Sequence, residues 1–117
     1  MKRVYELDVY KLAEELADMV WHDFDKFNKK VQNTVGYQII RSSDSLSVNI
    51  AEGCGRYTPA DRKKFYLYSS GSLEETKSWL RKLIRRKVLS ASNATEYKAI
   101  VEKLGPQLNA FINSTKA

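Results

Sequence analysis

One short stretch of the sequence, SLSVNIAEGCGRYTPADRKKF (45–65), places an amide, a carboxylate, a guanidinium and two glycines close together. Such groups could bind a small ligand, or they could hydrogen-bond to one another and hold a corner between two helices. We expect the second, because the glycines follow an apolar helical pattern and suit a turn with positive φ. The residues assigned to this junction motif are Arg41, Asn49, Glu52, Gly53, Gly55 and Arg56.

Residue types that commonly perform catalysis are scarce. His22 is the only histidine and Cys54 the only cysteine, so paired-cysteine, HExxH and ExxH patterns are missing from the sequence. The run EGCGRY follows a helical pattern rather than a strand, which does not suit a phosphate-binding loop. We therefore predict no enzyme activity, no catalytic residue, no metal site and no cofactor.

Charge is distributed unevenly along the chain, whose formal net charge is +6. Residues 5–30 carry four lysines against seven Asp and Glu, whereas residues 56–87 carry ten Lys and Arg against three Asp and Glu. A local basic surface of this kind favours a polyanion such as RNA or DNA, and a solvated helix face is the alternative. The predicted nucleic-acid-binding residues are Lys63, Lys64, Lys77, Arg81, Lys82, Arg85 and Arg86.

Apolar residues recur at helical spacing in four segments, and no alternating strand pattern competes with them. We predict helices over about 5–28, 33–54, 59–88 and 93–113, with 28–33 as a connection. Short connections make consecutive helices antiparallel neighbours, so the fold class is all-α, an up-down-up-down four-helix bundle in one domain, 1–117. Thr58 and Pro59 suit the start of the third helix, Asn93 is the expected cap of the fourth, and Pro106 predicts a kink near Glu102.

The second and third predicted helices each have apolar residues outside their core stripes. The core stripes comprise Val35, Ile39, Leu46 and Ile50 in the second helix, and Phe65, Ser69, Leu73, Thr76, Leu80, Leu83 and Ile84 in the third. A helix that is apolar on two sides in so small a chain indicates self-association. The predicted oligomer interface comprises Tyr37, Ile40, Val48, Leu67 and Tyr68.

Two runs of residues are similar to those of a known family. An S-x-N-I-A-E-G-x-G-R run is matched at 47–56, and a phenylalanine followed by G-S-L-x-E is matched by Phe65 and 71–75. Over about residues 5–112 the sequence resembles the bacterial four-helix bundle proteins encoded in 23S rRNA intervening sequences. Related proteins include the accessory variability determinant of diversity-generating retroelements, a pentameric barrel that binds nucleic acid and associates with a reverse transcriptase. The resemblance implies a homopentameric ring.

These observations together predict a non-enzymatic, oligomeric bundle that binds RNA or DNA without sequence preference through the third helix. The alternative is an oligomeric protein-interaction scaffold, for example an accessory partner of a reverse transcriptase. The charged start of the chain and the lack of a long apolar run favour the cytoplasm and argue against a membrane partner.

Overall fold

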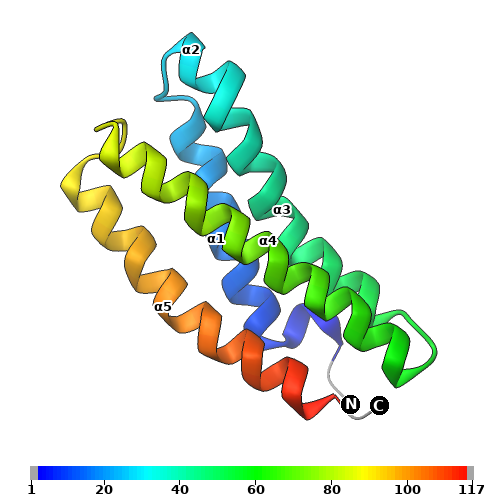
Figure 1. The fold of residues 1–117 in the computed structure, drawn as a ribbon. Helices are drawn as coiled ribbons and strands as arrows, with labels where there is room; N and C mark the ends of the chain where they lie inside the picture. The colour runs from blue at the N-terminus through cyan, green and yellow to red at the C-terminus, as the bar shows by residue number, and fades with distance from the viewer. Residues whose placement is uncertain (1–2, 116–117) are drawn as a thin grey trace.

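The computed structural model describes residues 3–115, and its four long helices each run antiparallel to the next along the chain (Figure 1). Two short helical segments precede the second long helix, and no strand occurs in residues 3–115. The prediction of an all-α, up-down-up-down four-helix bundle is confirmed. The elements in chain order are η1 (Val4–Glu6), α1 (Asp8–Phe24), α2 (Lys29–Val31), the π-helical η2 (Gln32–Gly36), α3 (Tyr37–Cys54), α4 (Pro59–Arg85) and α5 (Ala91–Ser114).

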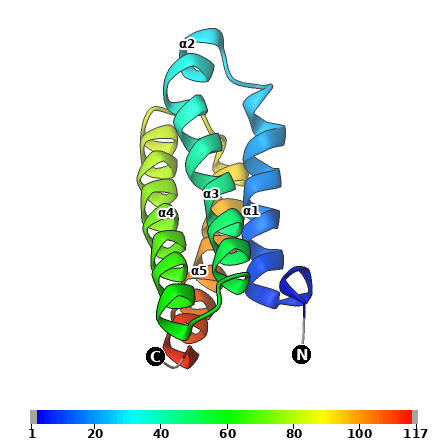
Figure 2. The ribbon, with the colours of Figure 1, turned by 90° about the vertical axis from the view of Figure 1, so that its right-hand side faces the viewer.

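The four long helices follow one another around the bundle in the order α1, α3, α4, α5. Helix α3 contacts α1 and α4, and α5 contacts the same two helices from the other side. Figure 2 shows α4 and α1 on opposite sides of the molecule, with α3 in front and α5 behind. The outer face of the α1/α3 pair is therefore opposite the outer face of the α4/α5 pair.

The apolar stripes of the four helices meet in one core. The second helix matches its predicted stripe fully, since Val35, Ile39, Leu46 and Ile50 are all buried. In α4 the prediction is wrong for Ile84, which is 41% exposed. The predicted Phe65 is only half-buried, and its neighbour Tyr66, which the pattern did not single out, is 4% exposed and belongs to the core instead. The buried residues on the other helices include Val9, Leu16, Val20, Tyr97, Ile100, Leu104, Leu108 and Ile112.

The first predicted helix, 5–28, is too long at both ends. Leu7 has an extended backbone, with φ −71° and ψ 133°, and separates η1 from α1. At the other end the chain leaves the helix after Phe24, where the Phe27 amide donates to the Phe24 carbonyl over three residues. Asn28 then begins the next helical segment, because its side chain accepts a hydrogen bond from the Val31 amide at 2.9 Å. The predicted connection at 28–33 is therefore mostly helical.

The last two helices also differ from prediction at their ends. Helix α4 ends at Arg85 rather than near residue 88. Helix α5 begins at Ala91, because Ser90 rather than Asn93 is the cap: the Ser90 hydroxyl accepts from the Asn93 amide at 3.1 Å. Helix α5 continues without a break from Ala91 to Ser114, with Pro106 inside it. Pro106 and Glu102, whose carbonyl loses its partner, are both exposed, so water can satisfy that carbonyl.

Candidate nucleic-acid interface

The basic surface is built on α4, and the start of this helix is fixed by local capping. Thr58 has an extended backbone and its hydroxyl accepts from the Asp61 amide at 3.1 Å. Pro59 occupies the first helical turn, where its missing N–H has no helical partner to lose. Asp61 adds a negative charge at the positive end of the helix dipole. The 27 residues of α4 then extend over about 40 Å.

The end of α4 is closed by a lysine in a conformation that usually belongs to glycine. Lys87 has φ 59° and is the one non-glycine residue with positive φ in residues 3–115. The Val88 amide donates to the Leu83 carbonyl at 2.9 Å, and the Lys87 amide donates to the Ile84 carbonyl at 3.0 Å. These two bonds are those of a Schellman motif. They turn the chain sharply away from the cationic end of the helix.

The predicted nucleic-acid-binding residues separate into two groups along this helix. Lys63 and Lys64 lie near its start, and the other five lie at or near its end, about 20 Å further along. A surface hollow of about 620 Å³ is shared by Lys77, Arg81, Lys82 and Arg85. Lys77 is neutralised in part, because its ammonium lies 2.9 Å from the Glu74 carboxylate. The structure thus brings four of the seven residues together and leaves the first two apart.

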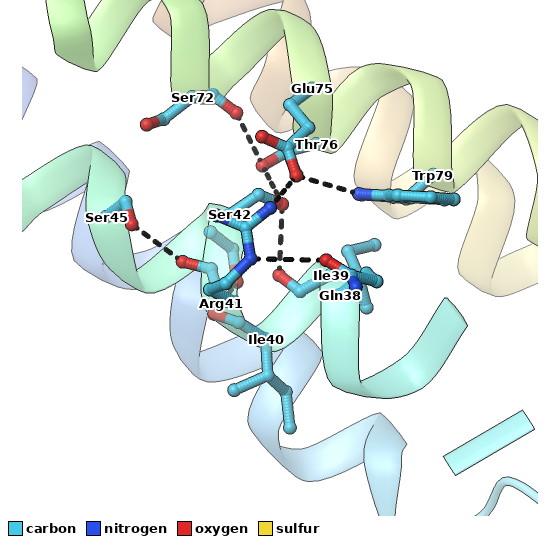
Figure 3. A network of polar contacts seen from close by, with 11 residues as sticks. Gln38, Ile39, Ile40, Arg41, Ser42, Ser45, Ser72, Glu75, Thr76 and Trp79 are labelled. Atoms are coloured by element: carbon cyan, nitrogen blue, oxygen red, sulfur yellow. Dashed lines mark hydrogen bonds and ion pairs between the residues drawn. The ribbon is translucent and has the colours of Figure 1, made fainter. Parts of the chain in front are cut away.

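A polar seam between α3 and α4 holds the basic helix in place (Figure 3). The Arg41 guanidinium pairs with Glu75 of α4 and also donates to Gln38 at 3.2 Å. The same Glu75 carboxylate accepts from the Trp79 indole at 3.1 Å. Deeper in the seam, the buried Thr76 hydroxyl donates to Ser42 at 2.8 Å. Arg41, assigned from sequence to the junction motif, therefore belongs to this seam, about 18 Å from Gly53 along α3.

The other members of the junction motif lie at the corner between α3 and α4. Arg56 donates to Glu52 at 2.7 Å, and its guanidinium carbon lies 4.4 Å from the centroid of the Phe65 ring. Asn49 bonds within its own helix, to the Ser45 carbonyl at 2.9 Å. Sequence reasoning missed Arg62, whose guanidinium donates to the carbonyls of Arg56 and Tyr57 at 3.1 and 3.0 Å. Of the predicted motif, only Glu52 and Arg56 bond to each other, and the hydrogen bonds from α4 to the corner come from Arg62.

The reason predicted for the two glycines, a turn with positive φ, is wrong. No glycine in residues 3–115 has positive φ, and Gly55 has φ −83°. Gly53 is required instead by a close approach, because a Cβ there would lie 2.5 Å from a ring carbon of Tyr66. Tyr66 in turn bonds through its hydroxyl to the Cys54 sulfur at 3.4 Å. Burial above all, and then this contact, raise the pKa of Tyr66.

The residues predicted to form an oligomer interface are mostly accessible in the single chain. Tyr37 and Val48 are each 63% exposed, and Leu67 and Tyr68 are 53% and 50% exposed. Ile40 is half-buried against the core. These residues come from two helices and lie on more than one side of the bundle. Four of these apolar side chains are therefore accessible to a partner.

The remaining chemistry-bearing side chains do not converge. His22 is exposed on α1, and Cys54 is half-buried at the end of α3. Within residues 3–115, no three His, Cys, Asp or Glu side chains are placed to share a metal ion. None of the described helices combines the length and the apolar character that a membrane span requires.

Fold and surface together define a class: a small antiparallel four-helix bundle with a basic, capped third long helix and a hydrogen-bonded corner before it. Residues 5–110 match the family described as "23S rRNA-intervening sequence protein", and the chain belongs to that family. Its fold is similar to that of a crystal structure from Bacteroides thetaiotaomicron VPI-5482, described as a protein with unknown function from the S23 ribosomal protein family. The TM-score is 0.79 at 22% identity, over 91% of this chain and 99% of that one. A comparison with curated proteins finds no match.

Proposed function

We propose that this protein is a self-associating bundle that binds RNA or DNA without sequence preference through the basic face of α4. The observation that carries the proposal is the group of cations at the end of that helix. Arg81, Arg85 and Arg86 are exposed, and within residues 3–115 none of them is paired with a carboxylate. Cations in such a position lose little by desolvation and remain available to phosphates.

The physical basis is the exchange of counterions. Each Lys or Arg that contacts a phosphate releases a condensed counterion from the nucleic acid, so affinity rises steeply as salt falls. A row of cations on one helix can follow a phosphate backbone, and contacts to phosphate carry no sequence information of their own. Binding is therefore expected to depend on charge and salt rather than on base sequence.

Self-association would raise the affinity of this weakly binding surface for a polyanion. The exposed side chains of Tyr37, Val48, Leu67 and Tyr68 favour burial by another molecule, and closed symmetric assemblies are the common outcome for identical chains. A homopentamer is the assembly that the family resemblance implies. Several basic faces on one ring would bind a single polyanion by avidity, with each copy contributing at a high effective concentration.

The test is fluorescence anisotropy with a labelled mixed-sequence RNA over a range of salt concentrations. The variant Lys82→Glu/Arg86→Glu reverses two charges at the end of α4, and Lys11→Glu/Lys103→Glu changes the net charge equally on other helices. We expect the first variant to bind at least tenfold more weakly, with a salt slope that is smaller by about two. The control should stay within about threefold of the parent.

Equal loss in both variants would mean that net charge alone attracts the RNA, and no loss in either would refute the assignment to α4. In that second case the scaffold function becomes the better hypothesis. A scaffold would bind a protein partner with an affinity that changes little between low and moderate salt.

A further inference from the structure

Opposite faces of the bundle carry opposite charge. Helices α1 and α3 together contain seven Asp and Glu against two Lys and Arg, whereas α4 contains seven Lys and Arg against three Asp and Glu. Because the helices follow the order α1, α3, α4, α5 around the bundle, the acidic pair faces away from α4 and α5 (Figure 2). Helix α5 contains two Lys against two Glu, so the basic charge on that side of the molecule comes from α4.

The outer face of α1 and α3, here called the acidic face, combines carboxylates with exposed apolar side chains. Glu14, Asp18 and Asp44 lie together on it, and within residues 3–115 none of the three is paired with a Lys or Arg. Burial, followed by the charges of Glu14 and Asp18, raises the pKa of Asp44. Val48, which is 63% exposed, lines a surface hollow together with Glu14 and Asp44, and Trp21 on α1 is 60% exposed. Trp21 follows Glu14 by seven residues, or two turns, which places both on one side of α1.

A groove of about 420 Å³ lies on the other side, between α4 and α5. Its floor is apolar and includes Leu80, Ile84 and Val101. Its edges are cationic: Arg81 comes from α4 and Lys98 from α5, and neither is paired with a carboxylate within the described part of the chain. This volume lies within the range of pockets that hold a small molecule or one large side chain. The groove thus suits an apolar group that is flanked by negative charge.

We infer that the α4/α5 groove binds the acidic face of a second copy of this chain. The inference rests on the self-association proposed above, but it assigns the contact to other surfaces: of the interface residues predicted from sequence, only Val48 lies on the acidic face as described here. The indole of Trp21 from one copy lies on Ile84 and Val101 of the next, and carboxylates such as Asp18 approach Arg81 and Lys98. Aromatic anchors in an apolar pocket with complementary charge around them are characteristic of specific interfaces.

The two surfaces differ, so this contact is head-to-tail rather than two-fold symmetric. Each copy that joins still offers one unused groove and one unused acidic face, and only closure into a ring satisfies all of them. The contact uses the cations beside the groove and leaves Lys82 and Arg86 outside it. Assembly and polyanion binding therefore share Arg81, whereas Lys82 and Arg86 serve polyanion binding alone.

Two single variants test this pairing. Trp21→Lys removes the indole and places a cation in the acidic face, while its groove stays intact. Ile84→Glu places a carboxylate in the groove, while its acidic face stays intact. Both positions are exposed in the single chain, so helicity measured by circular dichroism should match the parent. The matched control is Lys103→Glu, on an exposed position of α5 that does not line the groove.

The parent, both variants, the control and an equimolar mixture of the two variants are compared by size exclusion with light scattering. Each variant alone should run near the protomer mass of 13.5 kDa, and the control should assemble like the parent. The mixture should form a one-to-one dimer of twice the protomer mass. This follows because the intact acidic face of Ile84→Glu can enter the intact groove of Trp21→Lys.

Other outcomes overturn the pairing in distinguishable ways. If the parent assembles and either variant assembles equally well, self-association stands, the pairing is wrong and the groove is left to another occupant. If both variants are monomeric but their mixture stays monomeric, the two surfaces do not bind each other. If the parent itself is monomeric at every concentration measured, self-association fails and the pairing fails with it, whereas RNA binding is judged by its own assay.

Discussion

Replacing Gly53 by alanine should destabilise the corner between α3 and α4, and the structure sets the magnitude. The added methyl would lie 2.5 and 2.8 Å from two ring carbons of Tyr66 and 3.0 Å from the Arg62 carbonyl oxygen. Tyr66 cannot easily move away, because it is 4% exposed and its ring centroid lies 4.6 Å from that of Phe111. Overpacking of this kind costs about 1–3 kcal/mol.

An opposing term reduces this cost. Alanine is favoured over glycine inside a helix by up to about 1 kcal/mol. Because the contacts are so short, we take the upper part of the overpacking range and expect a net loss of about 1–2 kcal/mol in the free energy of unfolding. For a domain of 117 residues this corresponds to a fall of about 4–8 °C in Tm.

The assay is urea unfolding followed by circular dichroism, repeated at two protein concentrations so that assembly does not distort the comparison. Gly55→Ala is the matched control, since its nearest atom to an added Cβ lies at 3.6 Å and its backbone is already right-handed. We expect the control to stay within about 0.5 kcal/mol of the parent. In a Tyr66→Ala background most of the cost of Gly53→Ala should disappear, because only the contact with the Arg62 carbonyl oxygen remains. Equal effects at the two glycines, or a cost that persists in full without the ring, would refute the reasoning.

Two further predictions follow from backbone strain and from buried tyrosines. Lys87→Gly should stabilise the protein by about 1 kcal/mol, since a glycine adopts the φ of 59° without the penalty of a Cβ, and Arg86→Gly at φ −83° should instead be neutral or destabilising in the same urea assay. Stability should fall as pH rises above about 10, because burial and a 2.6 Å hydrogen bond to Asp23 raise the pKa of Tyr97 in the folded state, so the unfolded chain loses that proton first. Tyr97→Phe should reduce this slope by up to about 1.4 kcal/mol per pH unit, and an unchanged slope above pH 10 would contradict the assignment.

The bundle could be predicted from sequence because its signals are local and repeat many times. Apolar residues at helical spacing over four segments identify the helices, and Thr58 with Pro59 marks one start exactly where the structure has it. The boundaries were less predictable where two neighbouring residues could perform the same task. Ser90 and Asn93 are both residue types that favour the N-cap position. Which of them caps α5 depends on where the chain leaves the Schellman turn at Lys87, and a lysine does not predict such a turn.

The junction motif shows what pattern reasoning cannot supply. Glycine after an apolar helix suggests a left-handed turn, and that inference fails here because the requirement at Gly53 comes from a residue in another helix. Tyr66 lies thirteen positions later and next to Phe65, which the periodicity had preferred for the core. Arg41 and Glu75 are likewise far apart in sequence, so their pairing depends on the register of α3 against α4. Contacts between two helices depend on how the helices pack, and the pattern of one helix does not predict them.

The distribution of charge could be predicted from the sequence only in part. The sequence already separates an acidic first helix from a basic third one, and a polyanion is the partner that such a basic run suggests first. The order of helices around the bundle adds a second consequence, because it places the outer face of the acidic pair α1 and α3 opposite the groove between the basic α4 and the neutral α5. A chain with complementary opposite faces can bind itself as well as a polyanion, and at the groove the two uses would compete for Arg81. The cations beyond the groove, Lys82 and Arg86, are therefore the ones whose reversal separates nucleic-acid binding from assembly.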